Sequence, residues 1–183
     1  HVRDTVSERE LERLSRSYIG AIAWIIGPER DIPAPDVYTT PQIMGWMMDT
    51  ASMATGHALP AAVTGKPLAL QGSFGHSGAT ASGLLTCVRL ALQQLDIPMA
   101  GSRAVVQGFG KVGGTLAFLL HSAGMRVVGV SDVSGALANP AGVDIPALSD
   151  HVRANGVVAG FPLADEIPAE DLFALGCDVI VPA

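Results

Sequence analysis

The sequence predicts an α/β protein in which helices cover a parallel β-sheet. From residue 103 onward, short apolar runs typical of buried strands alternate with segments of helical period. This alternation favours parallel strands, because two parallel neighbours are usually joined by a helical crossover. Residues 8–56 instead carry two helix patterns, which indicates a helical part ahead of the sheet.

The first helix is predicted to begin at a capping box, with Ser7 at the N-cap and Glu10 three residues later. Gly27 and Pro28 are expected to close this helix. Apolar residues recur between these limits at spacings of three and four, at Leu11, Leu14, Tyr18, Ile22 and Ile25. The pattern predicts an amphipathic helix that buries this face.

A second helix is predicted from Pro41, which suits the first helical position, to about Gly56. Its methionines could form a binding surface, but a core role is favoured because methionine fills irregular core space well. An extended loop is expected over residues 29–37, where Pro33 and Pro35 stand. Residues 59–78 are rich in Gly, Pro and Ser and are expected to form a connector.

The elements of the predicted sheet and its helices follow from the same local patterns. A third helix is expected over residues 79–95, with one apolar face made by Leu84, Val88, Leu92 and Leu95. Strands are expected over residues 103–107, 125–130 and 178–181, and further helices over residues 115–123 and 145–154.

Three glycines stand between the strand at residues 103–107 and the helix that follows, in the order Gly-x-Gly-x-x-Gly. Gly108 permits a tight turn, Gly110 lets a pyrophosphate approach the backbone, and Gly113 lets helix and strand pack closely. The phosphates would rest on N–H groups at the positive end of the helix. Other loop residues predicted to bind the cofactor are Phe109, Lys111 and Val112. The motif predicts a Rossmann-type dinucleotide site; a doubly wound domain with incidental glycines is the alternative.

Asp132 follows Gly113 by 19 residues, at the end of the second predicted strand. A carboxylate at that place can accept hydrogen bonds from the hydroxyls of the adenosine ribose. Its negative charge disfavours a 2′-phosphate, and no arginine follows to bind one. NAD is therefore the expected cofactor, with NADP possible.

Composition and charge exclude several classes of protein. The chain has 49% hydrophobic residues and a formal net charge of -6, which argues against disorder and against a nucleic-acid partner. Its apolar runs are far shorter than the roughly 18 residues that cross a bilayer, and no membrane partner is expected. The two cysteines, Cys87 and Cys177, lack metal-ligand spacing and are predicted to be core residues in a reducing cytoplasm.

Six segments in order resemble the glutamate dehydrogenases, within the Glu/Leu/Phe/Val dehydrogenase family. They are Asp31-Ile-Pro-Ala-Pro-Asp-Val-Tyr-Thr39, Met44-Gly-Trp-Met-Met-Asp49, Val63-Thr-Gly-Lys-Pro67, Gln107-Gly-Phe-Gly-Lys-Val-Gly113, Val130-Ser-Asp-Val-Ser-Gly135 and Cys177-Asp-Val-Ile-Val-Pro-Ala183. The resemblance implies reversible NAD(P)-dependent oxidative deamination of L-glutamate to 2-oxoglutarate and ammonia. It also implies a homo-oligomer, a hexamer, acting on a small amino-acid substrate.

The resemblance assigns roles to two further residues. Asp36 matches the family's catalytic aspartate, and a carboxylate can shuttle the protons that imine formation requires. The local sequence alone favours a turn or helix-cap role for Asp36 before Pro41, and it is the resemblance that favours the catalytic role. Thr80 matches a cofactor-contacting threonine at the start of the third helix, where a hydroxyl is also an ordinary cap. The neighbourhood departs from the family, because His76 replaces an arginine and Gly78 a glutamate.

The resemblance also predicts how the chain is organised. Residues 1–58 would be the last helices of an α/β substrate domain, and residues 59–183 an incomplete NAD(P)-binding domain. Such a fragment of a longer chain is expected to be inactive by itself. The alternatives are a non-catalytic dinucleotide-binding or assembly fragment, and a dehydrogenase for another amino acid such as leucine. Lys66 is expected to have a structural role in Thr-Gly-Lys-Pro.

Overall fold

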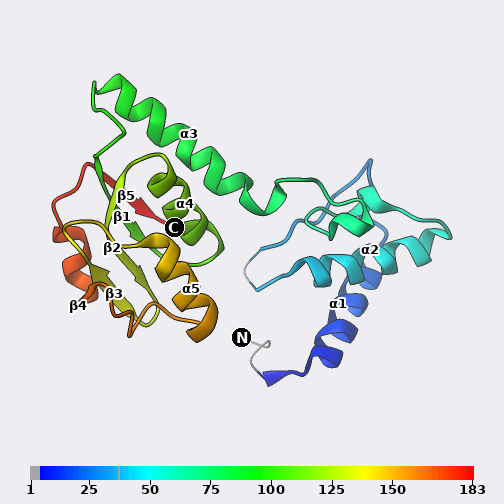
Figure 1. Ribbon diagram of the computed structural model, residues 1–183. Helices are drawn as coiled ribbons and strands as arrows, with labels where there is room; N and C mark the ends of the chain where they lie inside the picture. Colours follow the sequence, from blue (N-terminus) through cyan, green and yellow to red (C-terminus); the bar gives the residue numbers. More distant parts are fainter. Residues whose placement is uncertain (1–4, 37) are drawn as a thin grey trace. The chain divides into compact units, whose positions relative to one another are not determined.

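The computed structural model describes residues 5–36 and 38–183. The chain forms two compact units, His1–Ser77 and Gly78–Ala183 (Figure 1). The predicted domain boundary, between residues 58 and 59, stays a prediction, and the compact units divide later in the chain. They do so because Leu59, Ala62 and Val63 pack in the same apolar cluster as the helices that precede them.

The first unit is built on two helices, α1 (Glu8–Ile22) and α2 (Pro41–Thr55). The predicted capping box begins α1, since Ser7 and Glu10 each accept a hydrogen bond from the other's backbone N–H. The helix ends at Ile22, before Gly27 and Pro28, which were expected to close it. The chain turns there because Asp31 donates its N–H to the Ile25 carbonyl at 3.0 Å and so draws residues 25–31 into a loop.

The predicted buried face of α1 is right in part, since Leu11 and Ile22 pack against the apolar cluster of the first unit. Leu14 and Tyr18 are 51% and 54% exposed, whereas Ser15 and Ile19 are buried against α2. Burial of Ser15 is tolerated because its hydroxyl donates to the Leu11 carbonyl at 2.8 Å. The methionine-rich α2 contributes to the core as predicted, with Met44 and Met47 buried together with Ile43 and Ala51.

The predicted connector contains three single-turn 3-10 helices and is not simply extended. They are η2 (Pro60–Ala62), η3 (Leu68–Leu70) and η4 (His76–Gly78). Within the described residues, no helix combines the length and apolar character needed to span a membrane.

The second unit is an α/β fold, as predicted. Its sheet has the strand order β4-β3-β2-β1-β5, and β1 pairs in parallel with β2 and β5. The bounds are β1 (Arg103–Gln107), β2 (Arg126–Asp132), β3 (Gly135–Ala138), β4 (Asp165–Ile167) and β5 (Val179–Pro182). The antiparallel strands β3 and β4 were not predicted. Only two residues separate β2 from β3, so the chain reverses directly after Asp132.

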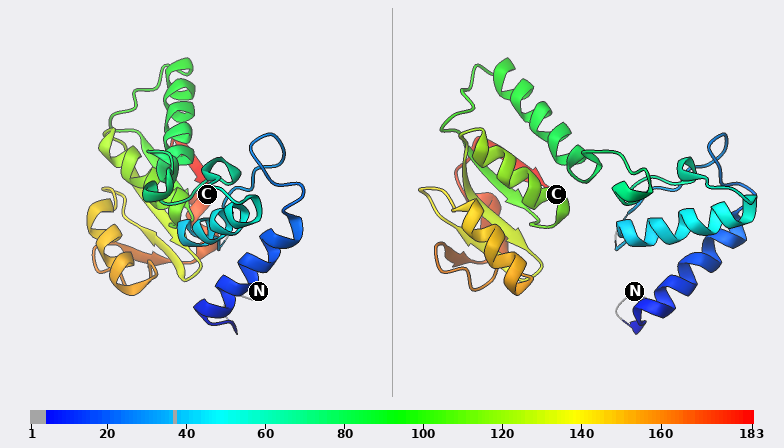
Figure 2. Two further views of the ribbon diagram at one scale, coloured as in Figure 1. Left: turned by 90° about the vertical axis from the view of Figure 1, so that its right-hand side faces the viewer. Right: turned by 45° about the vertical axis from the view of Figure 1, so that its right-hand side comes forward.

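Helices cover one face of this sheet and a 3-10 segment covers the other (Figure 2). The helices are α3 (Ala79–Gln94), α4 (Lys111–Ser122) and α5 (Ile145–Asn155), and the 3-10 segment is η5 (Ala169–Ala174). Successive residues of β1 point to opposite faces, since Val106 packs with the helices and Val105 packs with Leu172 of η5. This layering leaves the carboxyl ends of β1 and β2 open beside the glycine loop.

Two details of α3 and the cysteines differ from prediction. Leu95 is 67% exposed because α3 ends at Gln94, one residue short of it. Cys87 is exposed, since it lies beside the buried stripe of α3 and not on it. Cys177 is half-buried against the η5 cluster, as predicted, and this burial raises the pKa of its thiol.

Candidate functional site

The glycine loop turns sharply off the end of β1. Gly108 has a φ of +92° and donates its N–H to the Ser131 carbonyl of β2 at 2.8 Å. A Cβ at Gly108 would lie 2.2 Å from the carbonyl oxygen of Ala183, which follows β5. Both the left-handed conformation and the close approach therefore require glycine here.

The other two glycines of the motif differ in what surrounds them. A Cβ at Gly113, in the first turn of α4, would lie 2.0 Å from the Gly108 carbonyl oxygen, so α4 packs directly on the loop. A Cβ at Gly110, the N-cap of α4, would meet nothing within 4 Å. Gly108 and Gly113 thus serve the protein's own packing, while Gly110 leaves the backbone accessible from outside.

Pockets for small molecules and cofactors typically have volumes of about 300–1,000 Å³, and a cavity of ≈ 500 Å³ lies at this loop. Its lining residues are Gln107, Gly108, Phe109, Gly110, Ser131, Asp132, Val133, Val152, Gly156, Ala169 and Ala183. Four of the predicted cofactor residues therefore share one pocket. Lys111 is exposed and Val112 is half-buried in the first turn of α4, and neither lines the cavity.

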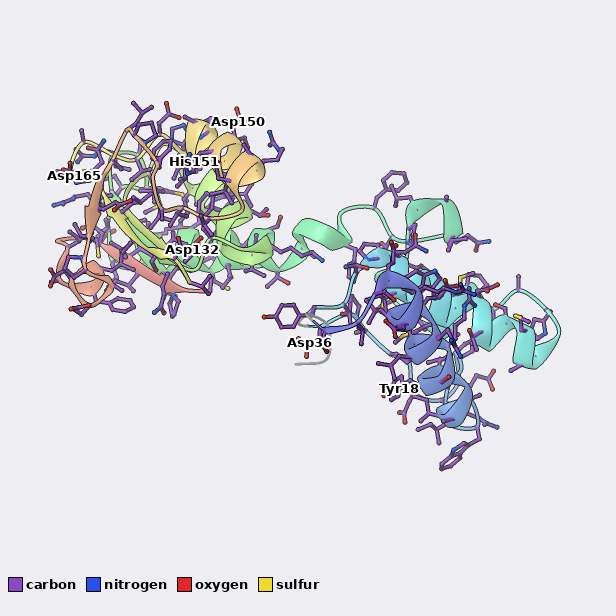
Figure 3. The ribbon with its side chains drawn as sticks, turned by 90° about the horizontal axis from the view of Figure 1, so that it is seen from below. Tyr18, Asp36, Asp132, Asp150, His151 and Asp165 are labelled. Carbon is purple, nitrogen blue, oxygen red and sulfur yellow. The ribbon has the colours of Figure 1, made fainter. Side chains whose placement is uncertain are left out.

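Asp132 stands at the end of β2 (Figure 3). Its carboxylate accepts three hydrogen bonds. Its Oδ1 accepts from the N–H and the hydroxyl of Ser134 at 2.7 and 2.5 Å, and its Oδ2 accepts from the N–H of Val158 at 2.9 Å. A carboxylate has about four acceptor positions, so roughly one remains, on Oδ2. The arrangement leaves room for a single ribose hydroxyl on this carboxylate.

The same cluster fixes the turn at residues 156–160, part of which lines the pocket. Ala159 donates its N–H to the Ser134 hydroxyl at 3.2 Å, and Gly160 donates its N–H to Glu166 Oε1 at 2.7 Å. His151 of α5 completes the cluster, because its Nε2 lies 3.0 Å from the Ala159 carbonyl, which can only accept. Sequence reasoning missed Ser134, although Asp-x-Ser is a common turn-forming spacing.

Asp36 lies in the first unit, on the loop between α1 and α2 (Figure 3). Its N–H donates to Thr39 Oγ1 at 2.5 Å, and its carbonyl accepts from the Thr39 N–H at 2.9 Å and from the Thr39 hydroxyl at 2.6 Å. The N-cap of α2 is Thr40, whose Oγ1 accepts from Ile43 at 3.3 Å. Asp36 therefore opens a turn and is not the helix cap. Val37 lies outside the described residues.

Two other residues singled out from the sequence can be placed. Lys66 donates its ammonium to the Val63 carbonyl at 2.9 Å, which supports the structural role predicted for it. Thr80 is exposed in the first turn of α3, and the N-cap of that helix is Gly78. The cap role considered for Thr80 is therefore wrong, and Thr80 does not line the glycine-loop pocket.

Fold and loop together define a Rossmann-type α/β unit preceded by a helical unit. The family profile described as "Glutamate/Leucine/Phenylalanine/Valine dehydrogenase" matches residues 72–183, and its "dimerisation domain" profile matches residues 3–53. The chain belongs to the Glu/Leu/Phe/Val dehydrogenase family.

Individual relatives agree with this assignment. A catabolic NAD-specific glutamate dehydrogenase of Bacillus subtilis is 48% identical over 98% of this chain and 42% of its own length. An NAD-specific glutamate dehydrogenase of Staphylococcus aureus is 43% identical over 97% of this chain and 43% of its own length. A hetero-hexameric glutamate dehydrogenase of Thermus thermophilus, solved in a leucine-bound form, matches with a TM-score of 0.90 and 39% identity, over 97% of this chain and 42% of that one. The chain thus spans less than half the length of these relatives.

Proposed function

We propose that this chain is part of an NAD-dependent glutamate dehydrogenase, which converts L-glutamate reversibly to 2-oxoglutarate and ammonia. The observation that carries the proposal is the glycine-loop pocket, in which Gly108, Gly110 and Asp132 meet. The similarity to NAD-specific glutamate dehydrogenases supplies the reaction and the substrate. The activity is proposed for the whole polypeptide that carries this chain.

The residues at the loop fit a dinucleotide. Gly110 has open space where a Cβ would be, so a pyrophosphate could approach the N–H groups at the start of α4. Lys111, Val112 and Gly113 belong to this first turn, and Lys111 is exposed where its ammonium could approach a phosphate. When bound, NAD supplies the hydride acceptor, C4 of its nicotinamide ring.

Asp132 would select the cofactor at its other end. The acceptor position left on Oδ2 suits one hydroxyl of the adenosine ribose, and the negative charge opposes a 2′-phosphate. This supports NAD over NADP. Phe109 is buried and would shape the floor of the pocket through packing, while Thr80 is proposed to contact the cofactor on the strength of the family resemblance.

Asp36 is proposed as the catalytic acid and base. Interconversion of an amino acid, an imine and a 2-oxo acid needs several proton transfers at one carbon centre, and a positioned carboxylate can carry them. The hydrogen bonds between Asp36 and Thr39 hold the Asp36 backbone in a defined turn, which supports this role.

The oligomer and the compartment are also proposals. A homo-hexamer is supported by the match to a dimerisation-domain profile and by similarity to a protein described as hetero-hexameric. A cytoplasmic location is supported by two free thiols, at Cys87 and Cys177, which suit a reducing compartment.

A second candidate is a dinucleotide-binding chain that does not turn over glutamate. The observation that favours it is the segment at residues 76–83, where His76 and Gly78 stand in place of the charged residues typical of the family. Turnover by the whole polypeptide, assayed with L-glutamate and with L-leucine, separates this candidate and a different substrate from the main proposal.

The decisive variant is Asp36→Asn in the whole polypeptide. We expect kcat to fall by about 10²- to 10⁴-fold, because the amide cannot shuttle protons. The affinity for NAD, measured by calorimetry, should stay at the wild-type value. Asp31→Asn is the matched control, since Asp31 is an exposed carboxylate on the same loop. Wild-type turnover by Asp36→Asn would contradict the role of Asp36.

A further inference from the structure

The Thr-Gly-Lys-Pro run at residues 64–67 packs against the loop that carries Asp36. Both segments belong to the first unit. Thr64 donates its N–H to the Pro33 carbonyl at 2.9 Å, and its hydroxyl lies 3.4 Å from the same oxygen. The run therefore holds the Asp36 loop three residues before the carboxylate.

Gly65 makes a second and closer contact with this loop. Its φ is +65°, and a Cβ there would lie 2.3 and 2.7 Å from Cγ and Cδ of Pro35. Pro35 is bonded directly to Asp36, and its ring is part of the backbone, so it cannot rotate away as a long side chain would. A side chain at residue 65 would have to displace the loop by about one ångström to reach ordinary contact.

The turn at residues 64–67 is itself well supported, so it is the Asp36 loop that would yield. Lys66 donates to the carbonyl of Val63, a residue 1% exposed in the core of the first unit. Gly72 also packs against this turn, since a Cβ there would lie 2.1 Å from the Lys66 carbonyl oxygen. The Gly72 N–H donates to the Pro67 carbonyl at 3.0 Å. The core at Val63, the turn at residues 64–67 and the Asp36 loop are therefore joined by successive contacts.

We propose that Gly65 is a positioning residue for Asp36, and that the run at residues 64–67 sets where the Asp36 carboxylate stands. The proposal rests on the catalytic role proposed for Asp36. The run at residues 64–67 would then serve the reaction as well as the fold, because Gly65 contacts the ring of Pro35 and Pro35 is bonded to Asp36.

The test compares Gly65→Ala with Gly56→Ala in the whole polypeptide. Gly56 has a similar φ of +73°, but a Cβ there would meet nothing within 4 Å, so only the conformational strain is shared. We expect Gly65→Ala to lower kcat by about 10- to 100-fold, as a misplaced catalytic group does. Gly56→Ala should keep kcat within about twofold and lower Tm through conformational strain alone, whereas Gly65→Ala should lower Tm further because of its contact with Pro35.

A second background keeps the test informative if Gly65→Ala folds poorly. Pro35→Ala removes both ring atoms that the new methyl group would meet. Adding Gly65→Ala to Pro35→Ala should therefore cost less in kcat than adding it to the wild type. A purely structural effect of residue 65 would instead lower Tm without this coupling in kcat.

The outcomes separate this proposal from the proposed function. Three results would each overturn the positioning role while Asp36→Asn still shows its loss of kcat. The first is a wild-type kcat in Gly65→Ala, and the second is an equal loss of kcat in Gly65→Ala and Gly56→Ala. The third is a loss of kcat that is simply additive when Gly65→Ala is combined with Pro35→Ala. Wild-type turnover by Asp36→Asn would instead overturn the catalytic role on which the inference rests.

Discussion

The glycine loop of the second unit and the Asp36 loop of the first unit both carry residues proposed for the reaction, yet they are held in different ways. Backbone holds the glycine loop: Gly108 and Gly113 lie against carbonyl oxygens of the loop itself and of Ala183. The Asp36 loop is held by Thr39 and by a turn about 30 residues further along the chain. A local sequence motif can therefore predict a loop such as the glycine loop. The position of the Asp36 loop depends instead on contacts between segments that are distant in the sequence.

The sharpest test of the backbone-held loop is Gly113→Ala beside Gly110→Ala. The added methyl at residue 113 would meet the Gly108 carbonyl at 2.0 Å, and we expect a loss of about 3 kcal/mol in stability. At residue 110 it meets nothing within 4 Å, and the loss should stay below about 1 kcal/mol. NAD affinity should nevertheless fall in Gly110→Ala, because the methyl would cover the approach to the backbone.

Circular dichroism and calorimetry would measure these effects. Both tryptophans of the chain, Trp24 and Trp46, lie in the first unit, so their fluorescence should report that unit unchanged in either variant. Equal stability losses in the two variants would show that the loop is not held by the contact between Gly113 and Gly108.

A smaller effect is expected from Asp132→Asn. The amide can still accept from Ser134, but its NH₂ group then faces the N–H of Val158, which is left without an acceptor. We expect a loss of about 1–3 kcal/mol in stability and weaker discrimination against NADP, because the negative charge is gone. Denaturant unfolding and calorimetry with both cofactors would check this.

Asp150→Asn is the control for the removal of a carboxylate from the second unit. Asp150 forms an exposed ion pair with Arg153, in which the two side chains are 73% and 76% exposed. Such pairs contribute little, so this variant should be close to wild type in both measurements. A similar loss in the two variants would argue against the role of Asp132 in fixing the turn at residues 156–160.

The smallest expected effect is on stability, at the capping box formed by Ser7 and Glu10, and it depends on pH. The hydrogen bonds from the Ser7 side chain and backbone hold the pKa of Glu10 below its ordinary value. Because the folded-state pKa is lowered, the stabilisation is complete above the ordinary pKa and is lost as pH falls through the folded value. Ser7→Ala should therefore lower Tm by a few degrees at pH 7, and the difference from wild type should shrink below about pH 4.

Tryptophan fluorescence would follow this transition in the first unit alone. A difference between Ser7→Ala and wild type that stayed constant from pH 7 to acid would contradict the contribution of Glu10.

More of the second unit than of the first could be predicted from the sequence, because more of its features depend on local patterns. The strands β1, β2 and β5 and the glycine loop were predictable because their signals are local: apolar runs and fixed glycine spacing. The hairpin strand β3 was missed, since its small residues carry no alternation. On α1, the prediction was right at Leu11 and Ile22, but Ile19 packs against α2 while Leu14 and Tyr18 are exposed, and the local spacing did not indicate this choice.

The site shows the same limit. The placement of Gly108, Gly110 and Asp132 around one pocket followed from their position at the ends of β1 and β2. The contact of Gly65 with Pro35 joins segments 30 residues apart, and no local pattern reports it. Likewise, Val158 donates to Asp132 through its backbone N–H, which every residue except proline would provide at that position.

The hydrogen bonds around Asp132 also bear on how tightly a nucleotide could be held. Asp132, Ser134 and Glu166 fix three successive N–H groups of the turn at residues 158–160 before any ligand arrives. A pocket wall that is already ordered loses little conformational entropy when it is occupied. Residues outside the cavity, such as Glu166, would then influence how long a nucleotide stays bound without touching it.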